Sequence, residues 1–172
     1  MINNFLRGLI YFVVFMLIQV LVLNNIHFMR IATPFLYLYF IIKMPVGSER
    51  SQVIFFSFLA GLIIDIFSNT PGMHATACTL VGFCRKPLIR VFMGKELPEG
   101  IFPSYHAFGF GGFVRYVSTF VLIHHATLFL IESFTLFDPI FLVIRIAESV
   151  VLSTCLICTV EAFNIESQKS GE

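Results

Sequence analysis

Residues 53–84 read VIFFSFLAGLIIDIFSNTPGMHATACTLVGFC, and this stretch decides the fold. It joins two apolar segments, 53–67 and 73–84, through a short polar turn at 68–72. In lipid the backbone must satisfy its own hydrogen bonds, so apolar runs separated by brief polar turns are typical of membrane helices. The alternating pattern of β-strands is not seen. The stretch therefore predicts two consecutive membrane helices.

The composition extends this interpretation to the whole chain. Of its 172 residues, 58% are hydrophobic and 12% are charged, and the mean hydropathy is +0.91. Soluble globular domains have about 25% charged residues, so this chain cannot cover itself with a polar surface. The formal net charge of +1 and the lack of a long basic run argue against nucleic-acid binding. We expect an integral membrane protein rather than a soluble enzyme.

The sequence predicts an all-α, polytopic bundle of about six transmembrane segments in one membrane domain, 1–163, with a short, disordered polar tail, 164–172. The second and fourth segments are short, because ~12 residues of helix reach only ~18 Å of a ~30 Å hydrocarbon core. They are tilted into the protein, extended by flanking residues, or re-entrant. The first segment ends without a small-x-small site, so it is an uncleaved span. The six segments are approximately 5–23, 31–42, 53–67, 73–84, 108–131 and 139–160.

The distribution of lysine and arginine predicts the orientation. If all six segments cross, Arg30 is the one flanking basic residue on its side, and Arg115 and Arg145 fall within or near spans. The positive-inside rule then places both termini in the cytoplasm. The basic residues of the richer side are Arg7, Lys43, Arg50, Arg85, Lys86, Arg90, Lys95 and Lys169.

The longest polar interval, 85–107, begins with a mixture of basic and apolar residues. It predicts an interfacial loop or helix held by anionic headgroups, or a docking surface for a partner, and these two interpretations are compatible. The candidate residues are Arg85, Lys86, Arg90 and Lys95.

Ionisable residues at membrane depth are costly and tend to face a partner or a cavity. The candidate intramembrane polar network comprises Asp65, Arg115, Arg145 and Glu148. It either fixes helix register or lines a substrate path. Polar residues recur at helical spacing along the last segment, so we expect that face to look into the bundle. Its members are Arg145, Glu148, Ser149, Leu152, Cys155 and Thr159.

A specific ion pair follows from depth. Asp65 and Arg145 both fall in the outer half of the membrane, so each can neutralise the other. Two alternatives stay open. Glu148, one helical turn from Arg145, is a rival partner for it, and Asp65 then caps the turn at 68–72 or meets a partner protein.

Small residues gather on two neighbouring segments. Small side chains let helices approach closely in lipid, so these faces are candidates for packing within the chain or against a partner. They comprise Ser57 and Gly61 on the third segment and Ala75, Thr79 and Gly82 on the fourth.

The sequence contains no recognisable catalytic motif and predicts no cofactor or metal. Adjacent His124 and His125 point about 100° apart on a helix and do not suit one zinc ion. Cys155 and Cys158 form a C-x-x-C inside an apolar helix, where packing is the expected role. An intramembrane enzyme rests only on scattered histidine and aspartate.

The stretch from Gly61 through Asp65 and the turn to His74 and Ala75, followed by Arg85-Lys86-Pro87, resembles the signature region of the rod shape-determining protein MreD family. In that family a Gly-x-x-x-Asp span end leads into a short turn and a Gly-x-x-Ala-type helix. The residues PFLYLY at 34–39 resemble the members from Bacteroidetes.

The resemblance implies a non-catalytic subunit of the cell-elongation machinery in the bacterial inner membrane. The expected direct partner is MreC, and the indirect partners are MreB and the glycosyltransferase and transpeptidase of peptidoglycan synthesis. The family is also similar in fold to the substrate-binding subunits of energy-coupling-factor transporters. The alternative function is therefore a small-molecule (vitamin)-binding transporter subunit.

Overall fold

The computed structural model describes residues 2–23, 33–93, 98–133 and 138–169. Side chains are described for 12–23, 33–92, 98–133 and 138–164. Over these ranges the chain is all-α, as predicted, and contains no strand. The helices are α1 (Ile2–Leu21), α2 (Leu38–Ile42), α3 (Arg50–Ser68), α4 (Met73–Met93), α5 (Tyr105–Phe108), α6 (Phe110–Glu132) and α7 (Pro139–Lys169).

Among the described residues, three helices are long and apolar enough to cross a membrane: α3, α6 and the Pro139–Asn164 part of α7. A shorter apolar stretch, Phe12–Leu21, lies in α1. Much of their large apolar surface is exposed, as on α3, where Phe55 is 59% and Ile66 70% exposed. An exposed apolar surface of this kind suits lipid rather than water. The chain is a multi-pass membrane protein.

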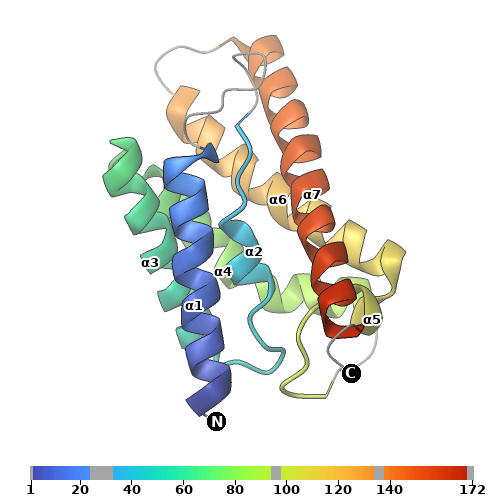
Figure 1. Ribbon diagram of the computed structural model, residues 1–172. Helices are drawn as coiled ribbons and strands as arrows, with labels where there is room; N and C mark the ends of the chain where they lie inside the picture. The colour runs from blue at the N-terminus through green and yellow to red at the C-terminus, as the bar shows by residue number, and fades with distance from the viewer. Residues whose placement is uncertain (1, 24–32, 94–97, 134–137, 170–172) are drawn as a thin grey trace.

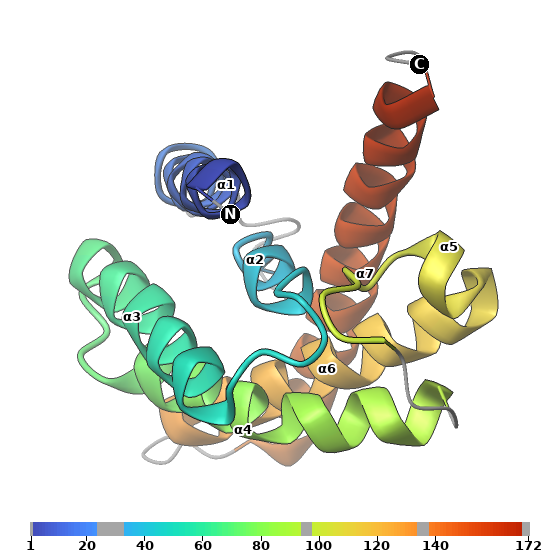
Figure 2. The same cartoon turned by 90° about the horizontal axis from the view of Figure 1, so that it is seen from below.

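The helices surround α2. Figure 2 shows α2 in the middle, with α1, α3, α4, α6 and α7 around it. The start of α1 and the end of α7 lie at the same end of the bundle, which we call the terminal end (Figure 1). The turn between α3 and α4 and the start of α7 lie toward the opposite end (Figure 1).

The second predicted segment, 31–42, is not one helix. Residues 33–37 are non-helical and only Leu38–Ile42 form α2. Pro34 accounts for the extended start, because proline has no N–H and restricts the residue before it to extended conformations. The N–H groups of Phe35 and Leu36 are bound by side chains of other helices instead of entering a helix. The segment passes through the bundle as extended chain followed by little more than one helical turn.

The fourth predicted segment is longer than expected and changes the status of the basic interval. Helix α4 runs on past Cys84 to Met93, with Pro87 inside it. The first part of the interval 85–107, up to Met93, is therefore the end of α4. It is helical, which is one of the two forms that the sequence predicted, but it continues the fourth segment rather than forming a separate element. At the terminal end, the loop that precedes α3 is hydrogen-bonded to the loop that precedes α5. Val46 N donates to Ile101 O (2.7 Å), and Gly100 N donates to Val46 O (2.8 Å).

The last two segments begin or end differently from the prediction. Gly109 has φ +66°, a conformation that favours glycine, and it separates the short α5 from α6. Helix α7 continues to Lys169. The predicted disordered tail, 164–172, is therefore helical up to Lys169.

Candidate functional site

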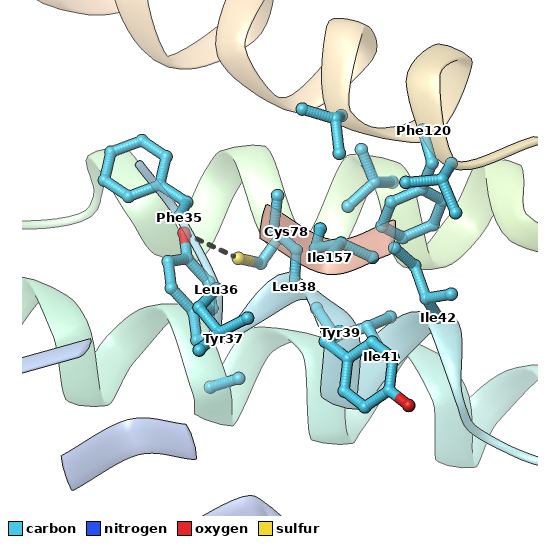
Figure 3. Packing of buried hydrophobic residues seen from close by; sticks show 14 of the residues in the cluster. Phe35, Leu36, Tyr37, Leu38, Tyr39, Ile41, Ile42, Cys78, Phe120 and Ile157 are labelled. Carbon is cyan, nitrogen blue, oxygen red and sulfur yellow. Dashed lines mark hydrogen bonds between the residues drawn. The ribbon is translucent and has the colours of Figure 1, made fainter. Parts of the chain in front are cut away.

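Residues 33–44, which we call the threaded segment, form the centre of the molecule. The side chains of Tyr37, Leu38, Ile41 and Ile42 are 0% exposed. Figure 3 shows this segment among Cys78 of α4, Phe120 of α6 and Ile157 of α7. Non-helical backbone at membrane depth is tolerated only where protein or water satisfies its polar groups. The contacts of the threaded segment are therefore the candidate functional site.

Helix α1 supplies the first of these contacts through Gln19, which is 0% exposed. Its Nε2 donates to Pro34 O (3.1 Å), and its Oε1 accepts from Leu36 N (2.8 Å). A primary amide offers a donor and an acceptor side by side, so it can pair with extended backbone as a neighbouring strand does.

Helix α7 supplies two serines on its buried face. Ser149 Oγ accepts from Thr33 N (3.2 Å), and Ser153 Oγ accepts from Phe35 N (3.0 Å). The serines are four apart on one face of the helix, and the residues they bind alternate along extended chain, as strand geometry requires. Helices α1 and α7 thus satisfy the threaded segment from two sides.

Tyr37 connects the threaded segment to α4 and α6. Its hydroxyl lies 3.0 Å from His74 Nδ1 and 2.8 Å from His124 Nε2, and Cys78 Sγ donates to it at 3.6 Å (Figure 3). One hydroxyl proton can be donated to only one ring. The Nδ1 of His124 has no partner among the described residues. A buried nitrogen without a partner costs less as a lone pair than as an N–H, so the proton of the neutral His124 ring lies on Nε2. His124 Nε2 therefore donates to the Tyr37 hydroxyl, and this hydroxyl donates to His74 Nδ1.

At the terminal end the segment is fixed by a buried carboxylate. Glu161 of α7 is 1% exposed and accepts from the Tyr39 hydroxyl (2.6 Å). Its other contact is an ion pair with Lys43 Nζ (3.0 Å), which also donates to Pro103 O (2.9 Å). A buried charge needs both a counter-charge and hydrogen bonds, and Glu161 has both.

The short α5 is tied to α7 at the same end. The Tyr105 hydroxyl donates to Cys158 O (2.9 Å). Desolvation raises the pKa of the Tyr105 phenol, so the hydroxyl keeps the proton that it donates.

Arg85 was predicted to lie at the membrane interface, but it is buried inside the bundle. It is 4% exposed, and its guanidinium donates to Ile42 O (3.4 Å) and Met44 O. It thereby satisfies carbonyls at the end of α2, which have no partner within so short a helix. Lys86 and Arg90 are exposed on α4, and Lys95 lies outside the described residues.

Asp65 caps the start of α4. Its carboxylate accepts from His74 N (2.9 Å), Ala75 N (2.9 Å) and the Thr70 hydroxyl (2.9 Å). The first N–H groups of a helix have no partner within the helix, and the helix dipole favours a negative charge there. The cap also fixes the turn, where Asn69 adopts φ +54°.

The small residues bring α3 and α4 into backbone contact. A Cβ on Gly61 would lie 2.5 Å from His74 O, and a Cβ on Gly82 would lie 2.5 Å from Ser57 Oγ. Ala75 is buried at the same contact. Thr79 is half-buried, and its hydroxyl donates to Ala75 O within its own helix.

The predicted ion pair between Asp65 and Arg145 is wrong. Arg145 pairs instead with Glu132 of α6, at 3.0 Å between Nη1 and Oε2, and lies over the Phe129 ring at 4.2 Å. Asp65 is occupied by the cap on α4. Glu148 makes no hydrogen bond or ion pair with any residue that the structure describes, so the local pair with Arg145 is wrong as well.

The polar face predicted for the last segment does not look into the bundle as a whole. Ser149 is 0% exposed, but Glu148, Cys155 and Thr159 are exposed on the other side of α7. Arg115 of α6 is also exposed. The four candidates for an intramembrane network are thus spread over separate places.

The sequence interpretation missed Gln19, Tyr37 and Ser153 as contacts of the threaded segment. One signal was available. A lone amide in an apolar span such as 5–23 is costly unless it finds a hydrogen-bonding partner, and Pro34 marks a backbone that needs such a partner.

The polar groups around the threaded segment bind groups of the chain itself. Tyr37, His74 and His124 bind one another, and no group of three His, Cys, Asp or Glu side chains within the described ranges could hold a metal ion. A hollow of about 400 Å³ lies away from them, against α7, lined by Cys158, Thr159, Ala162 and Phe163.

Comparisons with protein families, with curated proteins and with solved structures find no match to this chain.

Proposed function

We propose that the chain is a non-catalytic scaffold subunit of the bacterial cell-elongation machinery, which binds MreC in the inner membrane. Through MreC it helps to link the MreB cytoskeleton to peptidoglycan synthesis. The partner comes from the resemblance of residues 61–87 to the MreD family. The observation that carries the scaffold role is the filling of the bundle centre by the threaded segment.

The filled centre of the bundle favours a scaffold function over a function as a carrier of small molecules. In transporters with broken helices the substrate lies at the interruption, near the middle of the membrane. Here the interruption at 33–37 is occupied by the chain's own groups, with Gln19, Ser149 and Ser153 on its backbone. A ligand there would have to displace these hydrogen bonds, each costly to leave unmade in lipid.

The residues that carry the resemblance also support a structural role. Gly61 allows the close contact of α3 with α4, and Asp65 caps α4. These positions set the angle between two helices, as expected in a subunit whose surface must fit a partner.

We further propose six crossings, with the threaded segment as the second and the terminal end in the cytoplasm. The charges support it, because Lys43, Arg50, Lys86 and Arg90 belong to elements that reach the terminal end. With native cysteines replaced, Glu99→Cys should resist an impermeant thiol reagent in intact cells and Pro71→Cys should react. The reverse pattern would overturn the orientation.

The partner is tested by affinity purification from membranes. The tagged chain should recover MreC, and Gly61→Leu, which disrupts the α3–α4 contact, should recover far less. Gly111→Leu, at an exposed position of α6, is the matched control. Normal cell shape after depletion of the chain, or no MreC in the wild-type sample, would contradict the proposal.

The alternative of a vitamin-binding transporter subunit is favoured only by the broken second segment. Titration calorimetry of the purified chain with water-soluble vitamins distinguishes the two functions. The scaffold role predicts no heat of binding, whereas tight binding that Tyr37→Phe weakens would favour the transporter.

A further inference from the structure

The last part of α4, residues 83–92, lies across the bundle, and we call it the crosswise part of α4. Figure 2 looks along α1, and the end of α4 runs across that view. It also runs across the direction of α1 in Figure 1. Pro87 lies inside α4, and a proline within a helix removes a hydrogen bond and kinks the helix. The crosswise part therefore does not continue along the bundle.

One side of the crosswise part is anchored to the protein at the terminal end. Ile89 is buried in the hydrophobic core. Arg85 is buried as well, and its guanidinium donates to Ile42 O and Met44 O. Met44 belongs to the loop that precedes α3, so this contact holds the crosswise part near the end of the bundle rather than at its middle.

The opposite side of the crosswise part carries two rows of exposed residues. Residues four apart lie on one face of a helix. The first row is basic and consists of Lys86 and Arg90. The second row is apolar and consists of Phe83, Pro87 and Val91, of which Val91 is 73% exposed. A helix whose exposed side is partly basic and partly apolar suits the boundary between headgroups and acyl chains, with its axis in the membrane plane.

Arg50, at the start of α3, brings a third positive charge to this surface. Its guanidinium lies over the ring of Phe83, with 3.8 Å between Cζ and the ring centroid. The ion pairs of the described chain include none of Arg50, Lys86 and Arg90. Glu49, the exposed neighbour of Arg50, offsets only one of the three charges. The surface is therefore basic beside an apolar row.

We infer that the crosswise part of α4, together with Arg50, binds the phosphate groups of anionic phospholipids. Lysine and arginine donate charge-assisted hydrogen bonds to phosphate oxygens, and the apolar row rests against the acyl chains below the headgroups. An acidic segment of a protein in water would match the charges, but it would leave the exposed Val91 without hydrocarbon. Lipid matches both rows, and this surface is separate from the contact proposed with MreC.

The test measures lipid preference by native mass spectrometry of the purified chain in neutral detergent. Added phosphatidylglycerol is compared with phosphatidylcholine of the same acyl chains, and the wild type should prefer phosphatidylglycerol. In the double variant Lys86→Gln/Arg90→Gln the preference should fall about five- to twenty-five-fold, since each basic side chain near a membrane surface contributes about fivefold. The matched control, Lys86→Arg/Arg90→Lys, keeps both charges and should keep the preference.

A second control locates the effect on α4. Arg115→Gln removes an exposed charge from α6 and should change the preference less than twofold. The double glutamine variant should melt like the wild type in neutral detergent, because Lys86 and Arg90 make no hydrogen bond or ion pair with the described part of the chain. Earlier melting of this variant would show that the two charges act within the protein, and it would overturn the inference.

A nitroxide at Val91→Cys tests the depth of the apolar row, with native cysteines replaced and the chain in phosphatidylglycerol nanodiscs. Oxygen, which concentrates in hydrocarbon, should reach this label more often than a water-soluble nickel chelate does. The opposite order is expected at Glu99→Cys, on the loop before α5. Contact of the Val91 label mainly with nickel would favour a protein ligand and overturn the inference. An equal loss of preference in Arg115→Gln and Lys86→Gln, or no preference in the wild type, would overturn it too.

Discussion

The α3–α4 contact and the contact of α7 with the threaded segment hold the same bundle by different means. Between α3 and α4 the backbones touch, because Gly61 has no Cβ to keep His74 away. Between α7 and the threaded segment the backbones stay apart, and Ser149 and Ser153 reach across to bind N–H groups.

The difference shows where each contact is vulnerable. A contact of small residues is lost when atoms are added, since a packed backbone cannot move aside. A contact of polar side chains is lost when atoms are removed or made apolar, since the backbone group left without its partner cannot form a hydrogen bond with water inside the bundle. Each region should therefore respond strongly to one kind of substitution and weakly to the other.

The largest effect is expected from Gly61→Ala. The added Cβ would lie 2.5 Å from His74 O and 2.6 Å from Ala75 Cα, both backbone atoms. We expect a loss of about 3 kcal/mol, although alanine is the better helix former by about 1 kcal/mol. Thermal unfolding in detergent measures it. Gly111→Ala, where the nearest atom is Arg115 Nη2 at 3.5 Å, should leave stability unchanged or slightly raised. Equal melting of both variants would show that the helices are not in backbone contact.

A smaller effect is expected from Gln19→Leu. It leaves Pro34 O and Leu36 N without this partner, at about 1–3 kcal/mol for each group. Burial of the leucine side chain offsets about 1.5–3 kcal/mol of this cost, so we expect a net loss of about 2 kcal/mol. Hydrogen exchange followed by mass spectrometry should show faster exchange at residues 33–40 and little change in α3 and α4. Gln52→Leu, at an exposed amide of α3, is the control and should not alter exchange. Uniform protection in Gln19→Leu would mean that the amide does not hold the threaded segment.

The smallest effect is expected from the charges. Arg145 and Glu132 are partly exposed, with side chains 26% and 41% accessible, so their coupling should be about 0.2–1 kcal/mol. Asp65→Asn and Arg145→Gln should be additive within about 0.5 kcal/mol, because they share no partner. A double-mutant cycle of melting temperatures measures both couplings. If Arg145→Gln rescued the stability lost in Asp65→Asn, the two side chains would have to form an ion pair, contrary to the structure.

The sequence predicted the helical class and the membrane setting because both depend on the apolar runs alone. The contact at Gly61 was also accessible, since small residues at helical spacing are a local pattern. For Asp65 the sequence left an ion pair and a cap as alternatives. The structure shows the cap, whose partners are only nine and ten residues away.

The threaded segment could not be predicted in the same way. Its break follows from Pro34, but its partners on α7 are 116 and 118 residues distant. Nor does the spacing of polar residues on α7 reveal which ones turn inward. Glu148 and Ser149 are adjacent, yet one is exposed and the other buried, because the position of the threaded segment decides which face of α7 is covered.

The dependence of residues 33–37 on α7 has a consequence for biosynthesis. A chain emerging from the ribosome presents the threaded segment long before Ser149 and Ser153 exist, and Tyr39 meets Glu161 later still, 122 residues along. Until then its open backbone is poorly suited to lipid. We therefore expect the segment to remain in water, at the membrane surface or bound to the insertion machinery, and to enter the bundle only after α7 has been synthesised. The second segment of the chain is thus expected to be the last to be completed.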